Sequence, residues 1–157
     1  MSNIAQHPAL SSIVLAAGKG TRMKSDLPKV MHPAAGEPMV KWAVKASREA
    51  GAKEVVLVVG HMAELVTAAF ANDRPTCHFV MQNPQLGTGH AVDQARPLLA
   101  KGLLGEHCFV LCGDGPLIRS ETLHTLLQRH LTSGAAASLA TSVVADPTGY
   151  GRIERDA

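Results

Sequence analysis

The fold is decided by the stretch Ile13-Val-Leu-Ala-Ala-Gly-Lys-Gly-Thr-Arg-Met-Lys-Ser-Asp-Leu-Pro-Lys29. Its apolar start is typical of a strand, and its glycine-rich, basic continuation predicts a loop that leads into a helix. Gly18 and Gly20 carry no Cβ and therefore let the backbone approach a ligand closely. Open backbone N–H groups beside several cations suit a polyphosphate. The alternative interpretation is a solvated surface loop, which basic runs commonly form. Because glycines, a threonine and cations share one turn, we favour the phosphate interpretation.

Two common phosphate-binding motifs do not fit this turn. A Walker loop requires G-x-x-x-x-G-K-[ST], but Lys19 is followed by Gly20 instead of serine or threonine. A dinucleotide fingerprint requires a third glycine where Met23 stands, and that glycine normally permits close packing of helix and strand. The sequence therefore disfavours a Walker-type NTPase and an oxidoreductase that uses a nicotinamide cofactor.

The composition is typical of one soluble globular domain. The chain has 157 residues, of which 46% are hydrophobic and 18% charged, with a net charge of +2. Aromatic residues make up 3%, a poor supply of stacking platforms for single-stranded nucleic acid. The sequence has neither a secretory signal nor an apolar run near the roughly 20 residues of a membrane span. We therefore expect a cytoplasmic protein that binds neither nucleic acid nor a membrane.

The three cysteines, Cys77, Cys108 and Cys112, are an odd number, which favours free thiols in a reducing compartment. Cys108 and Cys112 share one face of a predicted strand but stand too far apart to share a metal ion. We expect them to act as small buried apolar residues.

Apolar periodicity predicts strands that alternate with helices. The predicted strands cover 12–16, 55–59, 77–81, 108–112 and 135–144. The predicted helices cover 38–50, 62–70, 91–99 and 120–131, with Pro38 at a first position, Gly51 as a stop and Ser120 as a cap. This order indicates an α/β protein with a Rossmann-like, mostly parallel sheet and helices on both faces. Because the chain stops as another segment begins, we expect the domain to be incomplete at its C-terminal end.

Ligands of open parallel sheets bind beyond the carboxyl ends of the strands. Three polar segments follow predicted strands, namely Gly18–Arg22, Gln82–His90 and Gly113–Pro116. We therefore expect the turns that begin near Gly18, Gln82 and Asp114 to surround one cleft. The eight histidines are scattered, and a hydrogen-bonded structural role is expected for each.

Two of these segments carry specific chemical groups. Asp114 lies between two glycines after an apolar strand, and carboxylate oxygens suit Mg²⁺. The alternative is ordinary Asp-Gly turn chemistry, but beside a triphosphate site we favour the metal. Gln82 offers the donor and the acceptor that a nucleobase edge requires. Gly87 and Thr88 offer backbone contacts, or Thr88 caps the next helix, and both interpretations stay open.

Together the segments resemble the sugar-nucleotide pyrophosphorylases, most of all their N-acetylglucosamine-1-phosphate uridylyltransferase branch. The resemblance implies the nucleotide-diphospho-sugar transferase fold and a Mg²⁺-dependent reaction. In it, UTP and N-acetylglucosamine 1-phosphate give pyrophosphate and UDP-N-acetylglucosamine, a precursor of the cell wall. The alternatives are a nucleotidyltransferase for another NTP or sugar phosphate, and a nucleotide-sensing module without catalysis. The matching segments run in the expected order through nearly the whole chain: Leu15–Met23, Ser25–Val30, Gln85–Ala91, Gly113–Ile118 and Asp146–Ile153.

The resemblance also implies roles for individual residues. Arg22 would stabilise the departing pyrophosphate, Lys29 would contact phosphate or sugar phosphate, and Asp114 would hold Mg²⁺. The implied substrate-binding positions are Leu15, Ala16, Ala17, Gly18, Lys29, Gln82, Gly87, Thr88, Cys112, Gly113 and Gly151.

Proteins of this branch also carry a β-helix acetyltransferase domain that forms homotrimers. The sequence shows none of its hexapeptide repeats, so we expect residues 1–157 to be a nucleotidyltransferase domain alone. The resemblance places the second metal ligand and the later sugar-binding residues beyond Ala157.

Overall fold

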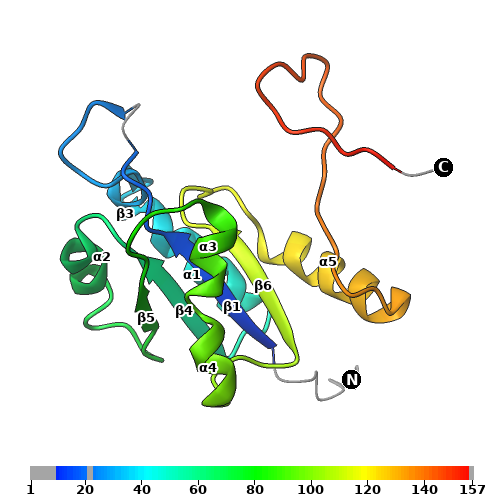
Figure 1. Ribbon diagram of the computed structural model, residues 1–157, viewed down its shortest axis with the longest axis horizontal. Helices are drawn as coiled ribbons and strands as arrows, with labels where there is room; N and C mark the ends of the chain where they lie inside the picture. The colour runs from blue at the N-terminus through cyan, green and yellow to red at the C-terminus, as the bar shows by residue number, and fades with distance from the viewer. Residues whose placement is uncertain (1–9, 21–22, 156–157) are drawn as a thin grey trace.

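The computed structural model describes residues 10–20 and 23–155. Its central sheet has four strands in the order β5-β4-β1-β6, and every neighbouring pair is parallel (Figure 1). Parallel pairing brings the carboxyl ends of all four strands to the same edge, and the strand order reverses between β1 and β6. The strands are β1 Leu10–Ala16, β4 Glu54–Val59, β5 His78–Met81 and β6 His107–Cys112.

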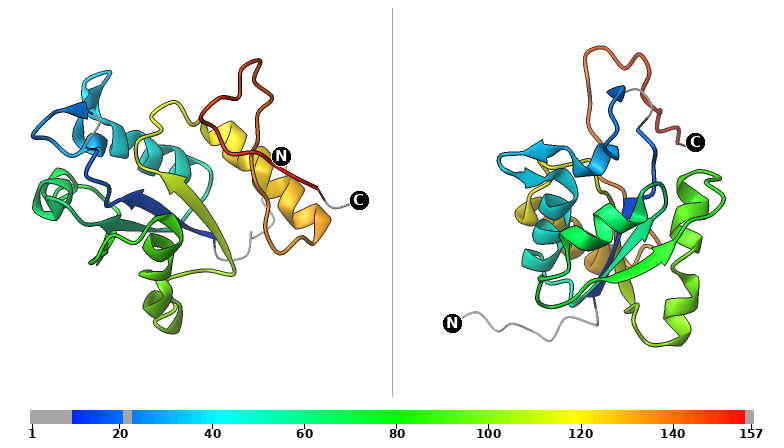
Figure 2. Two further views of the ribbon diagram at one scale, coloured as in Figure 1. Left: turned by 45° about the horizontal axis from the view of Figure 1, so that its top comes forward. Right: turned by 90° about the vertical axis from the view of Figure 1, so that its left-hand side faces the viewer.

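Helices cover both faces of this sheet (Figure 2). The helices are α1 Met39–Glu49, α2 Ala63–Ala69, α3 Thr88–Asp93, α4 Arg96–Ala100, α5 Ser120–Ser133 and the 3-10 helix Lys29–Met31. A small antiparallel pair, β2 Pro33–Ala34 and β3 Glu37–Pro38, leads into α1. None of the helices in the described residues combines the length and hydropathy that a membrane crossing requires.

The core explains why the central strands are apolar along their whole length. On one face, Val14 and Leu57 pack in a cluster that includes Val40 and Phe70 from the region of α1 and α2. On the other face, Ile13 and Val56 pack with residues of α3 and α4. A third, separate cluster joins α1 to α5. Strands buried on both faces need unbroken apolar sequences instead of alternating ones. The predicted α/β fold is confirmed.

The predicted strand at 135–144 is wrong. In the structure this segment forms no strand and is exposed, and it runs away from the sheet after α5 (Figure 1). A partly apolar sequence forms a strand only where a neighbour satisfies its backbone N–H and C=O groups. Among the described residues, the sheet ends at β6 with no further strand beside it.

Two helix predictions need correction, and one alternative that the sequence left open is decided. The single helix predicted at 91–99 is two helices, α3 and α4, because Pro97 has no N–H to donate and restricts the residue before it. Ser120 is the first residue of α5, and the N-cap is Arg119 without a side-chain cap bond. Thr88 likewise lies inside α3, whose N-cap is Gly87.

Two predictions at the start and end of α1 have different outcomes. Pro38 is the N-cap and not the first helical residue. Gly51 does terminate the helix, and its φ of +103° is one that glycine adopts without steric cost.

The prediction that Cys108 and Cys112 are buried is also wrong. Both are exposed, whereas Cys77 is buried, and all three thiols are free. The reason is that β6 is an edge strand: Phe109 points into the cluster shared with α5, while the opposite face of the strand is open to solvent.

Candidate active site

A cavity of about 420 Å³ opens at the carboxyl edge of the sheet. It is walled by the ends of β1 and β6, the 3-10 helix and the loop between β5 and α3. The turns near Gly18, Gln82 and Asp114 therefore meet at one place, as their position after parallel strands predicts. The residues named from the sequence that line this cavity are Leu15, Ala17, Gly18, Lys29, Gln82, Gly87, Thr88, Cys112 and Asp114.

Three other predicted residues that the structure describes do not line it. Ala16 is buried within β1, and Gly113 packs beneath the cavity, where its N–H donates to Leu15 O at 2.9 Å. Gly151 is exposed in the C-terminal segment and is not brought to this cavity. Arg22 lies outside the described residues.

Lys29 and Asp114 form the ion pair of the site. Lys29 Nζ lies 2.6 Å from Asp114 Oδ2, which joins the 3-10 helix to the turn after β6. The backbone at Gly20 lies so close to Lys29 that a Cβ added to Gly20 would be 2.6 Å from Lys29 Cβ. The φ of Gly20 is +63°. Both facts require glycine at position 20. The glycine-rich turn therefore shapes the wall on which Lys29 is held.

Gln82 and Gln85 supply the polar groups of the β5–α3 loop. Gln82 is 5% exposed, and its Nε2 donates to Gly87 O at 2.9 Å. Gln85 also lines the cavity, and its Nε2 donates to Ala17 O, which ties this loop to the end of β1. Sequence reasoning assigned no role to Gln85, although it stands inside the polar segment that was singled out.

The thiol of Cys112 is not an activated nucleophile. Desolvation raises its pKa above the ordinary value of 9.0, the Asp114 carboxylate raises the pKa further, and Lys29 opposes them. A thiol with a raised pKa is protonated near neutral pH and reacts slowly. The arrangement as a whole offers charge and hydrogen bonds for positioning a ligand.

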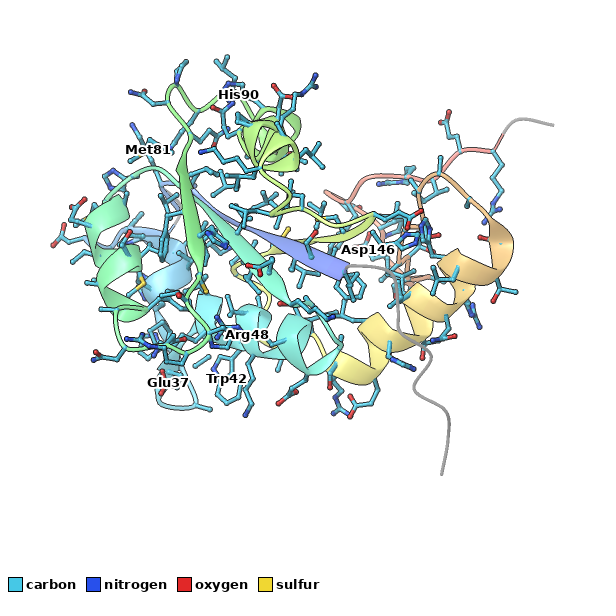
Figure 3. All side chains as sticks on the ribbon, turned by 90° about the horizontal axis from the view of Figure 1, so that it is seen from below. Glu37, Trp42, Arg48, Met81, His90 and Asp146 are labelled. Atoms are coloured by element: carbon cyan, nitrogen blue, oxygen red, sulfur yellow. The ribbon has the colours of Figure 1, made fainter. Side chains whose placement is uncertain are left out.

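A second cavity of about 360 Å³ lies along α1. Its cations are already neutralised, because Lys41 pairs with Glu37 and Asp73, and Arg48 pairs with Asp73. Figure 3 shows Glu37 and Arg48 on the side of the molecule opposite His90. This cavity is away from the strand ends, so we assign the site to the first cavity.

Residues 12–152 match the family model of the MobA-like NTP transferase domain. A curated relative, the "Bifunctional protein GlmU" of Geobacter metallireducens, is 53% identical over 93% of this chain and 30% of its own length. The protein of the same name from Pelobacter propionicus is 52% identical over 94% of this chain and 31% of its own length. The chain thus spans about a third of the length of these relatives.

A solved structure supports the fold. A nucleotidyl transferase from Methanothermobacter thermautotroptrophicus superposes with a TM-score of 0.63 at 23% identity, covering 76% of this chain and 57% of that chain. With the family model, the relatives and the fold in agreement, the chain belongs to the MobA-like NTP transferase domains and is a nucleotidyltransferase domain.

Proposed function

We propose that this domain transfers a uridylyl group from UTP to N-acetylglucosamine 1-phosphate, which forms UDP-N-acetylglucosamine and pyrophosphate. The observation that carries the proposal is the single cavity that gathers Lys29, Asp114 and Gln82 from three separate segments at the carboxyl edge of the sheet. Two observations support the choice of UTP and N-acetylglucosamine 1-phosphate as substrates. The sequence motifs of this chain resemble those of the uridylyltransferases, and its curated relatives share about half of its residues.

The reaction needs positioning and charge, and no protein nucleophile. An oxygen of the sugar phosphate attacks the α-phosphorus of UTP, the bond from that phosphorus to the β-phosphate oxygen breaks, and pyrophosphate leaves. In the proposed mechanism Lys29 Nζ turns from Asp114 to the phosphate oxygens when the nucleotide binds. A cation at that position stabilises the charge that develops in the transition state. Arg22 is proposed to stabilise the departing pyrophosphate from the same turn.

The donor set fits a magnesium ion that is held mainly by the substrate. Asp114 presents a carboxylate to the cavity, and the described residues contain no group of three metal-ligating side chains. Mg²⁺ commonly takes one or two carboxylates and completes its octahedron with phosphates and water. When bound, such an ion would neutralise the phosphates and align them for in-line displacement. Asp114 would orient that charge, and Lys29 would be released to the nucleotide.

The β5–α3 loop is the proposed contact for the base. Gln82, Gly87 and Thr88 line one wall of the cavity together. The end of β1 and the two residues after it, from Leu15 to Gly18, are proposed to run along the nucleotide. Cys112 ends the neighbouring strand β6 and Gly113 follows it, and Gly151 is proposed to approach the sugar.

Release of pyrophosphate tests this proposal. The chain is incubated with UTP, N-acetylglucosamine 1-phosphate and Mg²⁺, and UTP binding is measured in parallel by calorimetry. Asp114→Asn and Lys29→Met should each lower turnover by about 10²–10³-fold, the usual effect of losing one transition-state contact. Lys101→Met, which removes a cation outside the cavity lining, is the matched control and should leave turnover unchanged. Turnover that survives both active-site changes, or a chain that fails to bind UTP, would reject the proposal.

A further inference from the structure

His90 contacts Gln82, a residue of the cavity wall, but does not itself line the cavity. It lies on α3 (Figure 3) and places its Nδ1 3.1 Å from Nε2 of Gln82. The same Gln82 nitrogen donates to Gly87 O. The side-chain amide of Gln82 is therefore held at one end by two partners, one from the backbone and one from the histidine ring.

These two partners determine which way the amide faces. A backbone carbonyl only accepts, so the nitrogen and not the oxygen of the amide must face Gly87 O. The two hydrogens of that nitrogen are then used by Gly87 O and by His90 Nδ1. It follows that His90 Nδ1 acts as an acceptor and that the ring carries its proton on Nε2.

The other side of the ring is consistent with this tautomer. Nε2 of His90 lies 3.1 Å from the side-chain amide of Gln94, which is only half-buried. The nitrogen of that amide also donates to His90 O at 3.1 Å. A neutral ring has one acceptor nitrogen, so one of the two amides must turn its oxygen toward the ring. Gln94 is the one that turns, because water replaces His90 O as the partner of its half-exposed nitrogen, whereas Gln82 is 5% exposed. Gln82 has no such freedom, because turning would place its oxygen against the Gly87 carbonyl.

The atom that remains for a ligand is Gln82 Oε1. Within residues 10–20 and 23–155, no hydrogen bond to this oxygen is seen. Gln82 is a residue of the cavity wall. Because both hydrogens of its amide nitrogen are used by Gly87 O and His90 Nδ1, the amide offers a ligand its acceptor oxygen.

We propose that His90 is a positioning residue that fixes the acceptor face of Gln82 toward the ligand and thereby selects the class of pyrimidine base. Uracil and thymine carry an N–H at ring position 3, which donates to this oxygen. Cytosine carries a bare nitrogen there, and two acceptors would meet. The inference rests on the proposed function, because it presumes that a nucleoside triphosphate occupies this cavity.

The test is the ratio of the dissociation constants for UTP and CTP, measured by calorimetry on the whole chain with Mg²⁺ present. The wild-type protein should favour UTP. His90→Leu and the smaller His90→Ala should reduce this preference about tenfold, which corresponds to about 1.4 kcal/mol. His90→Asn should retain the preference, because its side-chain oxygen accepts where Nδ1 did. His78→Leu, which removes a histidine paired with Glu54 away from the cavity, is the control and should also retain it.

A ligand variant keeps the inference testable if a substitution prevents folding. UTP methylated at ring position 3 has no N–H to donate and should bind the wild-type protein at least tenfold more weakly than UTP. The outcomes separate the two proposals. A wild-type chain that binds no nucleotide rejects the proposed function. A UTP preference that is the same in His90→Leu and His90→Ala, or equal binding of UTP and CTP, rejects only the role of His90.

Discussion

Replacing Gly113 by alanine should destabilise the protein because the space for a side chain is already filled. An added Cβ would lie 2.8 Å from Leu15 O and 3.3 Å from carbons of both Val30 and Val40. The φ of Gly113 is not in the left-handed region, so crowding and not backbone strain is the cause. The substitution therefore isolates the cost of packing.

The size of this destabilisation depends on how far the atoms around Gly113 are able to move. Gly113 N–H donates to the same Leu15 carbonyl at 2.9 Å, and Leu15 is paired with Cys112 in the sheet. Any retreat from the clash stretches this hydrogen bond at the end of β6. Overpacking a tight site typically costs 1–3 kcal/mol, and we expect about 2–3 kcal/mol here because one of the neighbours is backbone.

Urea unfolding followed by circular dichroism measures this loss. Gly115→Ala is the matched control, because its added Cβ would meet only Cys112 O, at an ordinary 3.5 Å. We expect the control to stay within about 0.5 kcal/mol of the wild-type free energy of unfolding, as surface changes commonly do. If Gly113→Ala unfolds at the same urea concentration as Gly115→Ala, the packing argument is incorrect.

Two further predictions concern the ion pair and the thiol beside it. Lys29 and Asp114 have side chains that are 40% and 33% exposed, so solvent screens their attraction, and a double-mutant cycle on unfolding should give a coupling of about 0–1 kcal/mol. A coupling above 2 kcal/mol would mean that the pair serves stability. Cys112 should be alkylated with a midpoint above pH 9.0, since desolvation and the Asp114 charge raise its pKa and only the thiolate reacts. Asp114→Asn removes the negative charge, so it should lower this midpoint in peptide mass spectrometry, and an unchanged or higher midpoint would contradict the assignment.

Local sequence was sufficient to predict the four strands of the central sheet and the regions of the chain that form helices around it. The unbroken apolar run at 55–59 predicts a buried strand, and the structure has one there. Gly51 ends a helix because glycine adopts the positive φ of the residue after the helix. The polar turns after the strands were also predictable, because the carboxyl ends of parallel strands share one edge. The segment 135–144 was not predictable in this way, since the apolar residues in it do not make a strand without a partner strand.

By itself, then, the sequence determined the alternation of strand and helix and the turns from which a site is built, because burial periodicity and turn chemistry act between near neighbours in the chain. Only the tertiary structure decided that Lys29 meets Asp114, that Gln85 joins two loops, and that His90 and Gly87 share the amide nitrogen of Gln82. These contacts depend on the distance and direction between side chains from separate segments. Such distances are set when the sheet and its helices pack together, and no local pattern encodes them.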